Sequence, residues 1–258
     1  DNVITVNHYL LPEIRKKVYL NRKIGLGVMG WAELLLSLNL PYASDEAVAL
    51  GERLMDFVMA KSYEASEALA KERGIFDSWA ASIHAPNMPL RNATCNSIAP
   101  TGSISVIANT SYSIEPLYAL AYDRVGILGG KIQTEVNAVV IEKLKHMKLW
   151  NRRIREAILE TGSIQQVETL PKQVRMLFET SHEIPWEYHL LHQRAFQKHT
   201  DNAVSKTINL PKTATEMEIS KIYRTAWEYG LKGITIYRDG SKPNQILQKC
   251  GLNHSMSC

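Results

Sequence analysis

A run of small and hydroxyl-bearing residues, Ala99-Pro-Thr-Gly-Ser-Ile-Ser105, has the composition of an anion-binding loop. It follows a predicted buried strand and opens a predicted short helix, so backbone N–H groups would be left free at a helix N-terminus. Thr101, Ser103 and Ser105 add hydroxyl donors, and Gly102 would let the backbone approach a phosphate closely. The same residues also fit an ordinary strand-to-helix turn with a threonine cap, and their chemistry alone favours neither interpretation.

A glycine string, Gly25-Leu-Gly-Val-Met-Gly30, matches by letter the Gly-x-Gly-x-x-Gly fingerprint of dinucleotide-binding proteins. The fingerprint requires a hydrophobic strand directly before it, and Tyr19-Leu-Asn-Arg-Lys-Ile24 is a poor buried strand. Asp45 stands at the distance of the acidic partner, about twenty residues on, but fits better in the first turn of a helix. We therefore favour a helix start in which small residues let a neighbouring segment pack closely.

Four histidines lie in one region of the chain: His182, His189, His192 and His199. The last three share one face of a predicted helix with Phe196. A zinc site needs such clustering and further ligands, but no His-Glu-x-x-His motif occurs, and Pro185 follows His182 too closely for a helical ligand pair. We therefore predict no metal site and interpret the histidines as the polar face of a helix.

The three cysteines are few and scattered. Cys95 lies on the predicted strand before the anion-binding loop, where a lone cysteine is usually a small buried hydrophobe. Cys250 and Cys258 lie in a polar tail, and their spacing is not Cys-x-x-Cys. This pattern gives no disulfide framework and predicts a reducing compartment, which we take to be the cytoplasm.

Composition and charge indicate an ordinary globular protein. Of the 258 residues, 45% are hydrophobic and 22% charged, which argues against disorder. The net charge of +4 contains no block of like charges that would indicate nucleic-acid binding. No apolar run approaches the roughly 18 residues of a membrane helix, so we predict no membrane partner.

The predicted elements alternate between strands and helices, as in parallel α/β proteins. A helix is expected from Ser44, its N-cap, to Arg73, with Gly74 as the stop and a buried stripe at Leu50, Leu54, Phe57 and Val58. A capping box, Thr215-x-x-Glu218, opens another helix that ends at Gly230. Further helices are expected at 25–38, 131–146, 151–160, from Pro171 and at 186–198, and strands at 3–6, 92–98, 114–122, 205–210 and 234–237.

Several strings, in one order along the chain, resemble the large chains of ribonucleotide reductases. They are Arg22-Lys-Ile-Gly-Leu-Gly-Val-Met-Gly-Trp-Ala-Glu33, Arg91-Asn-Ala-Thr94, Ile98-Ala-Pro-Thr-Gly-Ser-Ile-Ser105, Ser113-Ile-Glu-Pro116, His199-Thr-Asp-Asn-Ala-Val-Ser-Lys-Thr-Ile-Asn-Leu-Pro211 and Gly230-Leu-Lys-Gly-Ile-Thr-Ile-Tyr-Arg-Asp-Gly-Ser241. Together they cover almost the whole chain. The last two are most similar to the class II, adenosylcobalamin-dependent enzymes, because Ile236-Tyr237 stands where the iron-dependent class has adjacent tyrosines.

The resemblance implies a fold and a role for the chain. The family fold is a ten-stranded α/β barrel of two five-stranded halves, and residues 1–240 would supply the helix-rich second half, with 241–258 as the start of a flexible tail. The complete enzyme would replace the ribose 2′-hydroxyl with hydrogen, using adenosylcobalamin, a cysteine thiyl radical and a thioredoxin-type reductant. The residues that would hold the substrate phosphate are Pro100, Thr101, Gly102, Ser103, Ile104 and Ser105.

The radical chemistry would depend on residues outside this chain. The family's Asn-Pro-Cys-Gly-Glu finger loop is absent, so we assign no catalytic residue here, and none to Cys95. Because the chain begins with Asp1 rather than Met, we expect a portion of a longer protein that needs an N-terminal remainder, with a homodimer as a further partner arrangement. Alternatives are a non-catalytic half that pairs with a separately encoded N-terminal half, and a nicotinamide-dependent oxidoreductase that uses the glycine string.

Overall fold

The computed structural model describes residues 1–127 and 131–241 of the chain, and the predicted tail at 241–258 lies outside them except for its first residue. The helices are α1 (Asn2–Val6), α2 (Pro12–Asn21), α3 (Trp31–Ser37), α4 (Asp45–Arg73), α5 (Ile104–Ala108), α6 (Ala138–His146), α7 (Arg152–Thr161), α8 (Lys172–Leu177), α9 (Trp186–Gln197) and α10 (Glu216–Glu228), with a 3-10 turn at Trp79–Ala81. The strands are β1 (Ala121–Ile127), β2 (Lys131–Val136), β3 (Thr207–Leu210) and β4 (Thr235–Arg238).

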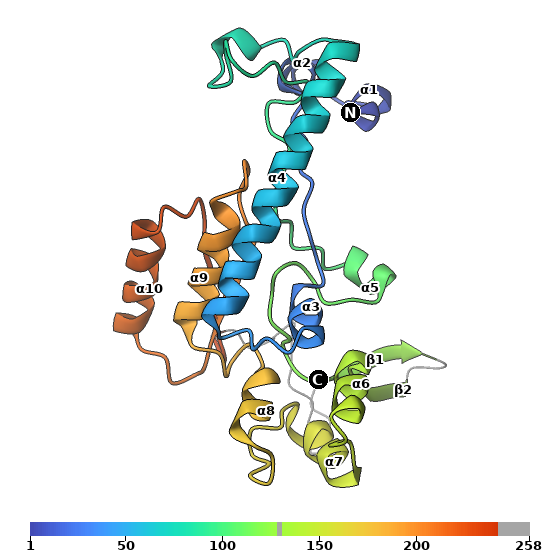
Figure 1. Cartoon of the computed structure of the whole chain (residues 1–258), viewed down its shortest axis with the longest axis vertical. Helices are drawn as coiled ribbons and strands as arrows, with labels where there is room; N and C mark the ends of the chain where they lie inside the picture. The colour runs from blue at the N-terminus through green and yellow to red at the C-terminus, as the bar shows by residue number, and fades with distance from the viewer. Residues whose placement is uncertain (128–130, 242–258) are drawn as a thin grey trace.

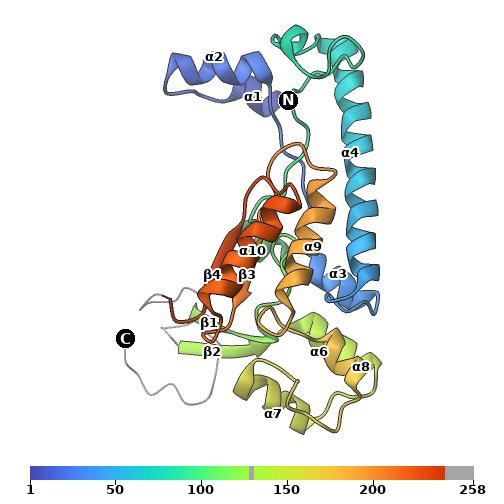
Figure 2. The ribbon, with the colours of Figure 1, turned by 90° about the vertical axis from the view of Figure 1, so that its left-hand side faces the viewer.

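Helix α4 runs along most of the length of the molecule (Figures 1 and 2). Its predicted start is confirmed, because the Ser44 hydroxyl accepts a hydrogen bond from the backbone N–H of Ala47 at 3.2 Å. Gly74 follows its last residue with a φ of +83°, which favours glycine. The predicted buried stripe is wrong in part: Phe57 is 62% exposed, while Ala47, Gly51 and Met55 are buried against α9 and its neighbours.

Parallel pairing joins four segments that are far apart in the sequence. Leu26 pairs with Asn96, Ile98 pairs with Val204, and β3 pairs with β4, all in parallel. The spatial order is therefore 24–26, 94–98, 203–210 and 235–238, and helices lie in each connection between them. The predicted alternation of strands with helices is confirmed, and the strands at 205–210 and 234–237 fall within a residue or two of β3 and β4.

An antiparallel hairpin replaces part of a predicted helix. The prediction of helix from residue 131 is wrong, since β2 pairs with β1 and α6 begins only at Ala138. The strand predicted at 114–122 is also displaced, because β1 begins at Ala121. Residues 131–136, Lys-Ile-Gln-Thr-Glu-Val, alternate polar and β-branched types with period two, which suits a strand once a partner is available.

The N-terminal region is helical where an extended chain was expected. Residues 2–6 form α1 instead of a strand, and α2 begins at Pro12, a residue well suited to the first turn of a helix. Conversely, the helix predicted from Gly25 begins only at Trp31, and Gly25 to Gly30 precede it as an extended segment. Figure 2 shows α1 and α2 beside the C-terminal end of α4, with α6, α7 and α8 at the opposite end of the molecule.

Three clusters of buried side chains form the core of the described chain. One packs α6 and α7 against Phe178, a second packs α3, α4 and α9 around Trp31 and Phe196, and a third packs β3 against α10 around Ile208 and Ile222. The second cluster includes Ile98 and Val204, so it packs these helices against two of the parallel segments. Across residues 1–127 and 131–241, no helix has the length and apolar character needed to cross a bilayer.

Candidate functional site

The predicted anion-binding loop, Pro100–Ser105, leaves the sheet beside the start of β3. It follows Ile98, whose backbone pairs with Val204 and accepts a hydrogen bond from the N–H of Ser205 at 2.8 Å. The loop ends in α5, a helix of only five residues, which lies on the opposite side of the molecule from α10 (Figure 1). The predicted short helix is therefore confirmed, whereas the strand predicted before the loop is present only as two single bridges, at Asn96 and Ile98.

Thr101 fixes the conformation of the loop. Its φ of +53° lies in the left-handed region, which L residues other than glycine rarely adopt. The Thr101 hydroxyl accepts a hydrogen bond from the backbone N–H of Ser113 at 2.7 Å, and its carbonyl accepts one from the N–H of Ser105 at 3.0 Å. Ser113 is itself left-handed, with a φ of +50°. Two strained residues thus hold each other in place through one hydrogen bond.

The exposed part of the loop keeps its donors free. Gly102, Ser103 and Ile104 are exposed, and within the described residues their backbone N–H groups have no hydrogen-bond acceptor. A Cβ on Gly102 would meet no atom within 4 Å, so space is open above the backbone. The Ser105 hydroxyl is buried and donates to the Gly102 carbonyl at 3.4 Å. Of the three hydroxyls suggested by the sequence, only that of Ser103 is exposed and unbonded in this part of the chain.

A buried charged cluster, Glu115–Lys206–His189, lies beside the loop and was not anticipated from the sequence. The Lys206 ammonium contacts a Glu115 carboxylate oxygen at 2.5 Å and the His189 Nδ1 at 2.8 Å. The other Glu115 oxygen accepts a hydrogen bond from the backbone N–H of Thr207 at 2.6 Å. Burial lowers the pKa of Lys206, which Glu115 opposes, and burial together with the Lys206 charge lowers the pKa of His189. A lysine inside the predicted strand at 205–210 was the only local signal for this cluster.

The predicted polar face of histidines is wrong for two of its members. His189 and His192 are fully buried, and the His192 Nε2 lies 2.8 Å from the Tyr42 carbonyl oxygen. Burial lowers the pKa of His192 to about 3, so this ring is neutral at physiological pH. His199 alone reaches the surface, where its Nδ1 lies 3.1 Å from an Asp56 oxygen. No three His, Cys, Asp or Glu side chains of the described residues gather as a metal site.

The glycine string lets two backbone segments approach each other. A Cβ on Gly27 would stand 2.1 Å from the Ser97 carbonyl oxygen, and one on Gly25 would stand 2.4 Å from the Ser97 hydroxyl. The N–H of Leu26 donates to the Cys95 carbonyl at 2.9 Å, which binds the two segments together. These glycines therefore let two segments of the chain pack closely on each other, which agrees with the interpretation favoured over a nucleotide site. The packed segment is extended, however, and is not the start of a helix.

Asp201 binds the segment that contains Cys95. Its carboxylate accepts hydrogen bonds from the Tyr63 hydroxyl at 2.5 Å and from the backbone N–H of Cys95 at 2.6 Å. Cys95 is fully buried, as predicted, and burial raises the pKa of its thiol to about 11. The thiol is therefore protonated and inert. Cys250 and Cys258 lie outside the described residues.

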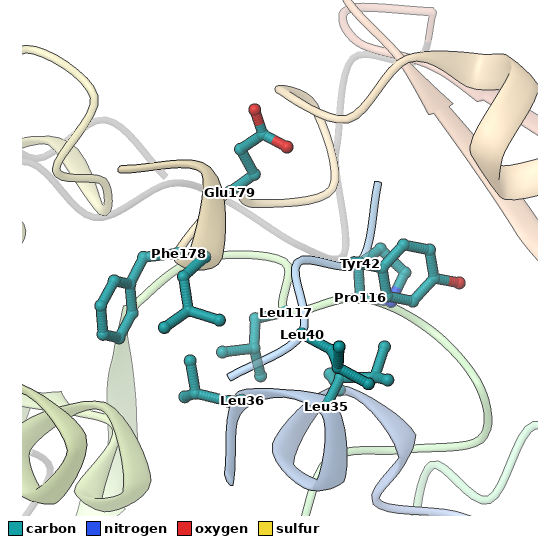
Figure 3. Close-up of a pocket in the computed structure, with 10 residues that line it drawn as sticks. Leu35, Leu36, Leu40, Tyr42, Pro116, Leu117, Phe178 and Glu179 are labelled. Carbon is teal, nitrogen blue, oxygen red and sulfur yellow. The ribbon is translucent and has the colours of Figure 1, made fainter. Parts of the chain in front are cut away.

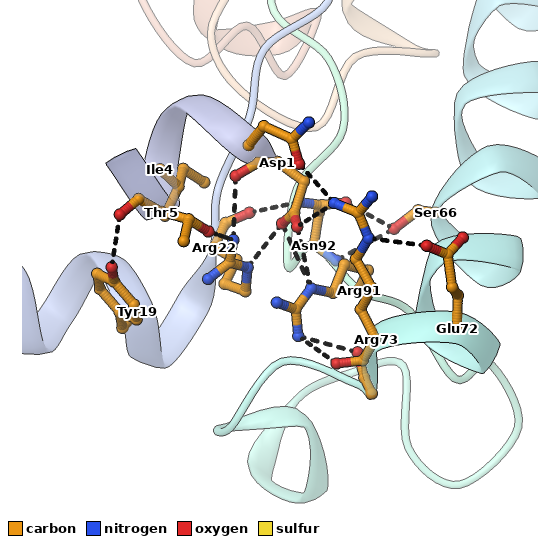
Figure 4. A network of polar contacts seen from close by, with 12 residues as sticks. Asp1, Ile4, Thr5, Tyr19, Arg22, Ser66, Glu72, Arg73, Arg91 and Asn92 are labelled. Carbon is orange, nitrogen blue, oxygen red and sulfur yellow. Dashed lines mark hydrogen bonds and ion pairs between the residues drawn. The ribbon is translucent and has the colours of Figure 1, made fainter. Parts of the chain in front are cut away.

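Three arginines converge on the carboxylate of Asp1 (Figure 4). The distances to its oxygens are 2.6 Å from Arg22, 3.3 Å from Arg91 and 3.6 Å from Arg73, and the Arg22 and Asp1 side chains are buried. The Asn92 side-chain amide also donates to the Arg22 carbonyl at 2.9 Å. The Arg91-Asn92 motif thus joins the N-terminal segment to the end of α4, away from the loop that precedes α5.

A shallow apolar pocket lies beside α3 (Figure 3). Burial and the nearby Glu183 raise the pKa of Glu179, at its edge, to about 7. The Tyr42 hydroxyl in its wall donates to the Ile114 carbonyl at 2.8 Å. The pocket therefore offers few polar groups for a ligand. Its lining residues are Ala32, Leu35, Leu36, Leu40, Tyr42, Pro116, Leu117, Leu177, Phe178 and Glu179.

Comparison with known proteins gives consistent matches. The family model described as the ribonucleotide reductase barrel domain matches residues 1–89 and 83–237. The vitamin B12-dependent ribonucleoside-diphosphate reductase of Thermoplasma acidophilum is 43% identical over 248 residues, which are 96% of this chain and 32% of that protein. The protein of the same name from Mycobacterium tuberculosis is 43% identical over 96% of this chain and 35% of its own length.

A solved structure gives the same result at the level of the fold. The alpha subunit of the Actinobacillus ureae class Id ribonucleotide reductase superposes with a TM-score of 0.77 at 27% sequence identity, over 90% of this chain and 42% of that one. The chain thus spans about a third of the length of the curated relatives it matches. The resemblance seen in the motifs is confirmed.

Proposed function

Because this chain belongs to the ribonucleotide reductase family through its barrel domain, we propose that it is part of a large chain that reduces ribonucleotides to deoxyribonucleotides. The observation that carries the proposal is the extent of the similarity. At 43% identity over 96% of the chain, the match to the B12-dependent relatives rests on the whole described fold and not on one motif.

In this proposal, residues 1–240 belong to the second half of a ten-stranded α/β barrel, and 241–258 begin a C-terminal tail. Four segments in parallel order, with helices in each connection, support a half-barrel. Exposed apolar side chains on α5 support a neighbour that covers them in the complete enzyme. They are Ile104, Val106 and Ile107, at 54%, 78% and 85% exposure.

The loop Pro100–Ser105 would hold the phosphate of the substrate. Support comes from the free N–H groups of Gly102, Ser103 and Ile104, which can donate to phosphate oxygens, and from the open space above Gly102. Thr101 and Ser105 would shape the loop, since their hydroxyls take part in bonds within the chain. Pro100 would set the entry to the turn.

The radical step would belong to the complete enzyme. Adenosylcobalamin would supply the radical chemistry there, and the catalytic cysteine would be a residue of the complete enzyme that this chain does not contain. The pocket beside α3 does not fit a cobalamin, because it offers one carboxyl and a tyrosine hydroxyl that is already bonded. We therefore assign no residue of this chain to the cofactor. The contribution of this chain is to bind and orient the substrate.

The partners of this chain, in the same proposal, are the N-terminal remainder of the reductase, a ribonucleotide, a thioredoxin-type reductant and a second copy in a homodimer, in the cytoplasm. A separately encoded N-terminal half is the alternative arrangement. The use of Gly25–Gly30 for a nicotinamide cofactor is disfavoured, because the Ser97 backbone lies where the cofactor would need to approach Gly27.

Reductase assays of two preparations test the proposal. The 258-residue chain alone, given adenosylcobalamin, a dithiol reductant and a ribonucleoside diphosphate, should form no deoxyribonucleotide. The same chain completed by its N-terminal remainder should form it. Turnover by the chain alone would overturn the partial role, and a completed chain without turnover would overturn the function.

A charge-reversal experiment tests the phosphate loop. In the complete enzyme, Ser103→Asp should raise the KM for a ribonucleoside diphosphate at least tenfold, since a carboxylate would repel the phosphate at close range. Ser105→Asp should also raise the KM, but through burial of a charge within the loop. Ser220→Asp, on the exposed face of α10, adds the same charge elsewhere and should leave the KM unchanged. Equal KM values for Ser103→Asp and Ser220→Asp would refute the assignment.

A further inference from the structure

The pair Glu115–Lys206 is buried more completely than a charged pair usually is. The Lys206 side chain is 0% exposed and that of Glu115 8% exposed. Taking two charges out of water is costly, and well-packed apolar side chains can often replace such a pair without loss of stability. Neither residue belongs to the proposed phosphate loop or to the radical chemistry. The arrangement of their hydrogen bonds suggests what the pair does instead.

Glu115 connects its own segment to β3 by both carboxylate oxygens. One oxygen contacts the Lys206 ammonium and the other accepts from the N–H of Thr207, so the carboxylate bonds both the first residue of β3 and the residue before it. Lys206 also contacts His189 of α9, whose Nε2 lies 3.1 Å from the Ser181 carbonyl oxygen. The carboxylate position is therefore fixed from the sheet and from the helix behind it.

Ser113, two residues before Glu115, connects the fixed Glu115 segment to the loop. Its N–H donates to the Thr101 hydroxyl at 2.7 Å, and its own hydroxyl donates weakly to the Ser205 carbonyl at 3.5 Å. Ser113 is 1% exposed, so no water competes for these bonds. Because both Ser113 and Thr101 are left-handed, neither would hold its conformation without the other contacts.

We infer that the buried Glu115–Lys206 pair is a positioning device for the loop Pro100–Ser105, acting through Ser113 and Thr101 to aim the free N–H groups of the loop at the substrate phosphate. The inference rests on the proposed function of the loop. Neither charged residue touches the substrate, and their effect is on the geometry with which Gly102 and Ser103 meet it. The pair should therefore matter for phosphate affinity beyond its effect on stability.

Substitution of Glu115 by Gln in the complete reductase is the first test. Glu115→Gln keeps the shape, removes the charge and turns an N–H₂ group toward Lys206 or Thr207. The KM for a ribonucleoside diphosphate should rise about tenfold, the equivalent of about 1.4 kcal/mol, with kcat changed far less. The inhibition constant of the parent ribonucleoside, which has no phosphate, should stay unchanged. Tyr63→Phe removes a partly buried hydrogen bond to Asp201, which does not contact the loop in the described residues, and should leave both constants unchanged.

Thr101 gives a second test that does not depend on burying an unpaired charge. Thr101→Val keeps the shape but removes the acceptor for the Ser113 N–H, and Thr101→Ser keeps the acceptor. The KM should be higher for Thr101→Val than for Thr101→Ser. In a double-mutant cycle, Glu115→Gln should add little to Thr101→Val, because both substitutions break one series of contacts.

The possible results separate the inference from the proposed function. A Glu115→Gln enzyme with lower stability but wild-type KM would overturn the inference, as would KM effects that multiply in the double mutant. If Glu115→Gln does not fold, equal KM values for Thr101→Val and Thr101→Ser would overturn it. If Ser103→Asp leaves the KM unchanged, the phosphate-binding role of the loop fails, whatever Glu115→Gln does.

Discussion

Adding one methyl group at Gly27 should disrupt the parallel pairing on which the site is built. The Cβ of an alanine would stand 2.1 Å from the Ser97 carbonyl oxygen and 3.2 Å from its carbonyl carbon. Non-bonded carbon contacts are comfortable at about 3.5 Å and beyond, so the two segments would have to separate by roughly 1 Å. Both atoms that collide with the new methyl belong to the backbone, and no side-chain rotation can relieve the contact.

The expected loss of stability can be worked out from the hydrogen bonds beside the clash. Leu26 donates to the Cys95 carbonyl at 2.9 Å and accepts from the Ser97 N–H at 3.0 Å, and a shift of about 1 Å would break both bonds. Each bond contributes about 1 kcal/mol, and forcing extra volume into a packed region costs about 1–3 kcal/mol. We expect Gly27→Ala to lower the free energy of unfolding by about 3–5 kcal/mol, a large part of the 5–15 kcal/mol typical of a folded domain.

Urea denaturation of the complete reductase chain is the assay, with Gly233→Ala as the matched control. A Cβ on Gly233 would meet nothing within 4 Å, so the same substitution there should change the free energy by less than about 0.5 kcal/mol. Similar midpoints for the two variants would refute the close packing of Gly27 on Ser97. A Gly27→Ala protein of normal stability that had lost binding of a nicotinamide nucleotide would instead support the dinucleotide interpretation.

Three further substitutions test the caps, the core and the titratable groups. Ser44→Ala should cost about 1 kcal/mol in urea denaturation, because it removes the acceptor at the start of α4. Gly51→Ala should cost about 1–2 kcal/mol in the same assay, because its Cβ would stand 2.7 Å from the buried Phe196 ring and overpacking outweighs the helical preference for alanine. Glu179→Gln should raise the urea midpoint much more at pH 8 than at pH 5.

The sign of the Glu179 effect follows from linkage. Its pKa of about 7 in the fold lies above the ordinary value of 4.5, so the folded state binds the proton more tightly than the unfolded state. The stability that the bound proton contributes to the fold is fully present below pH 4.5 and is lost as the pH rises through 7. The amide of Glu179→Gln does not ionise, so the variant does not lose this stability as the pH rises.

Each of these predictions has a result that contradicts it. A midpoint difference between wild type and Glu179→Gln that is the same at pH 5 and pH 8 would contradict the raised pKa. If adding Phe196→Leu does not relieve the cost of Gly51→Ala, the clash with the ring is not its cause. A Ser44→Ala chain as stable as the wild type would mean that water replaces the cap.

The ends of α4 and α10 were predicted well because their causes lie within a few residues. Ser44 and Thr215 both accept the backbone N–H three residues on, as their sequence patterns indicate. Gly74 and Gly230 both adopt positive φ just beyond the last helical turn. Such contacts depend on local sequence alone, and the surrounding fold does not alter them.

The β1–β2 hairpin was missed because its cause is not local. Residues 131–136 can form a strand only when β1 lies beside them, since a strand without a partner leaves its backbone N–H and C=O groups unpaired. Read with the amphipathic residues of α6 that follow, the same segment looks like the first turns of a longer helix. The pairing with β1 decides the outcome, and the pattern of residues 131–136 alone does not contain that information.

The buried polar residues could not be predicted for a similar reason. His192 bonds to a carbonyl 150 positions away and Lys206 to a carboxylate 91 positions away. By residue type alone, a histidine or lysine on an amphipathic segment is expected at the surface, where most of them are found. Only the fold brings together the hydrogen-bond partners that offset the free-energy cost of burying these side chains.

The loop Pro100–Ser105 shows how this limit bears on function. Its composition predicted three hydroxyl donors, but the Thr101 and Ser105 hydroxyls are bonded within the chain, one of them to a residue 12 positions away. Within the described residues, the donors that no acceptor uses are three backbone N–H groups and the Ser103 hydroxyl, and these would be left for a ligand. A phosphate held mainly by backbone groups depends on the path of the chain more than on side-chain identity. The residues that decide affinity are then those that fix this path, which is why Glu115 and Lys206, and not a further hydroxyl, are the positions to change.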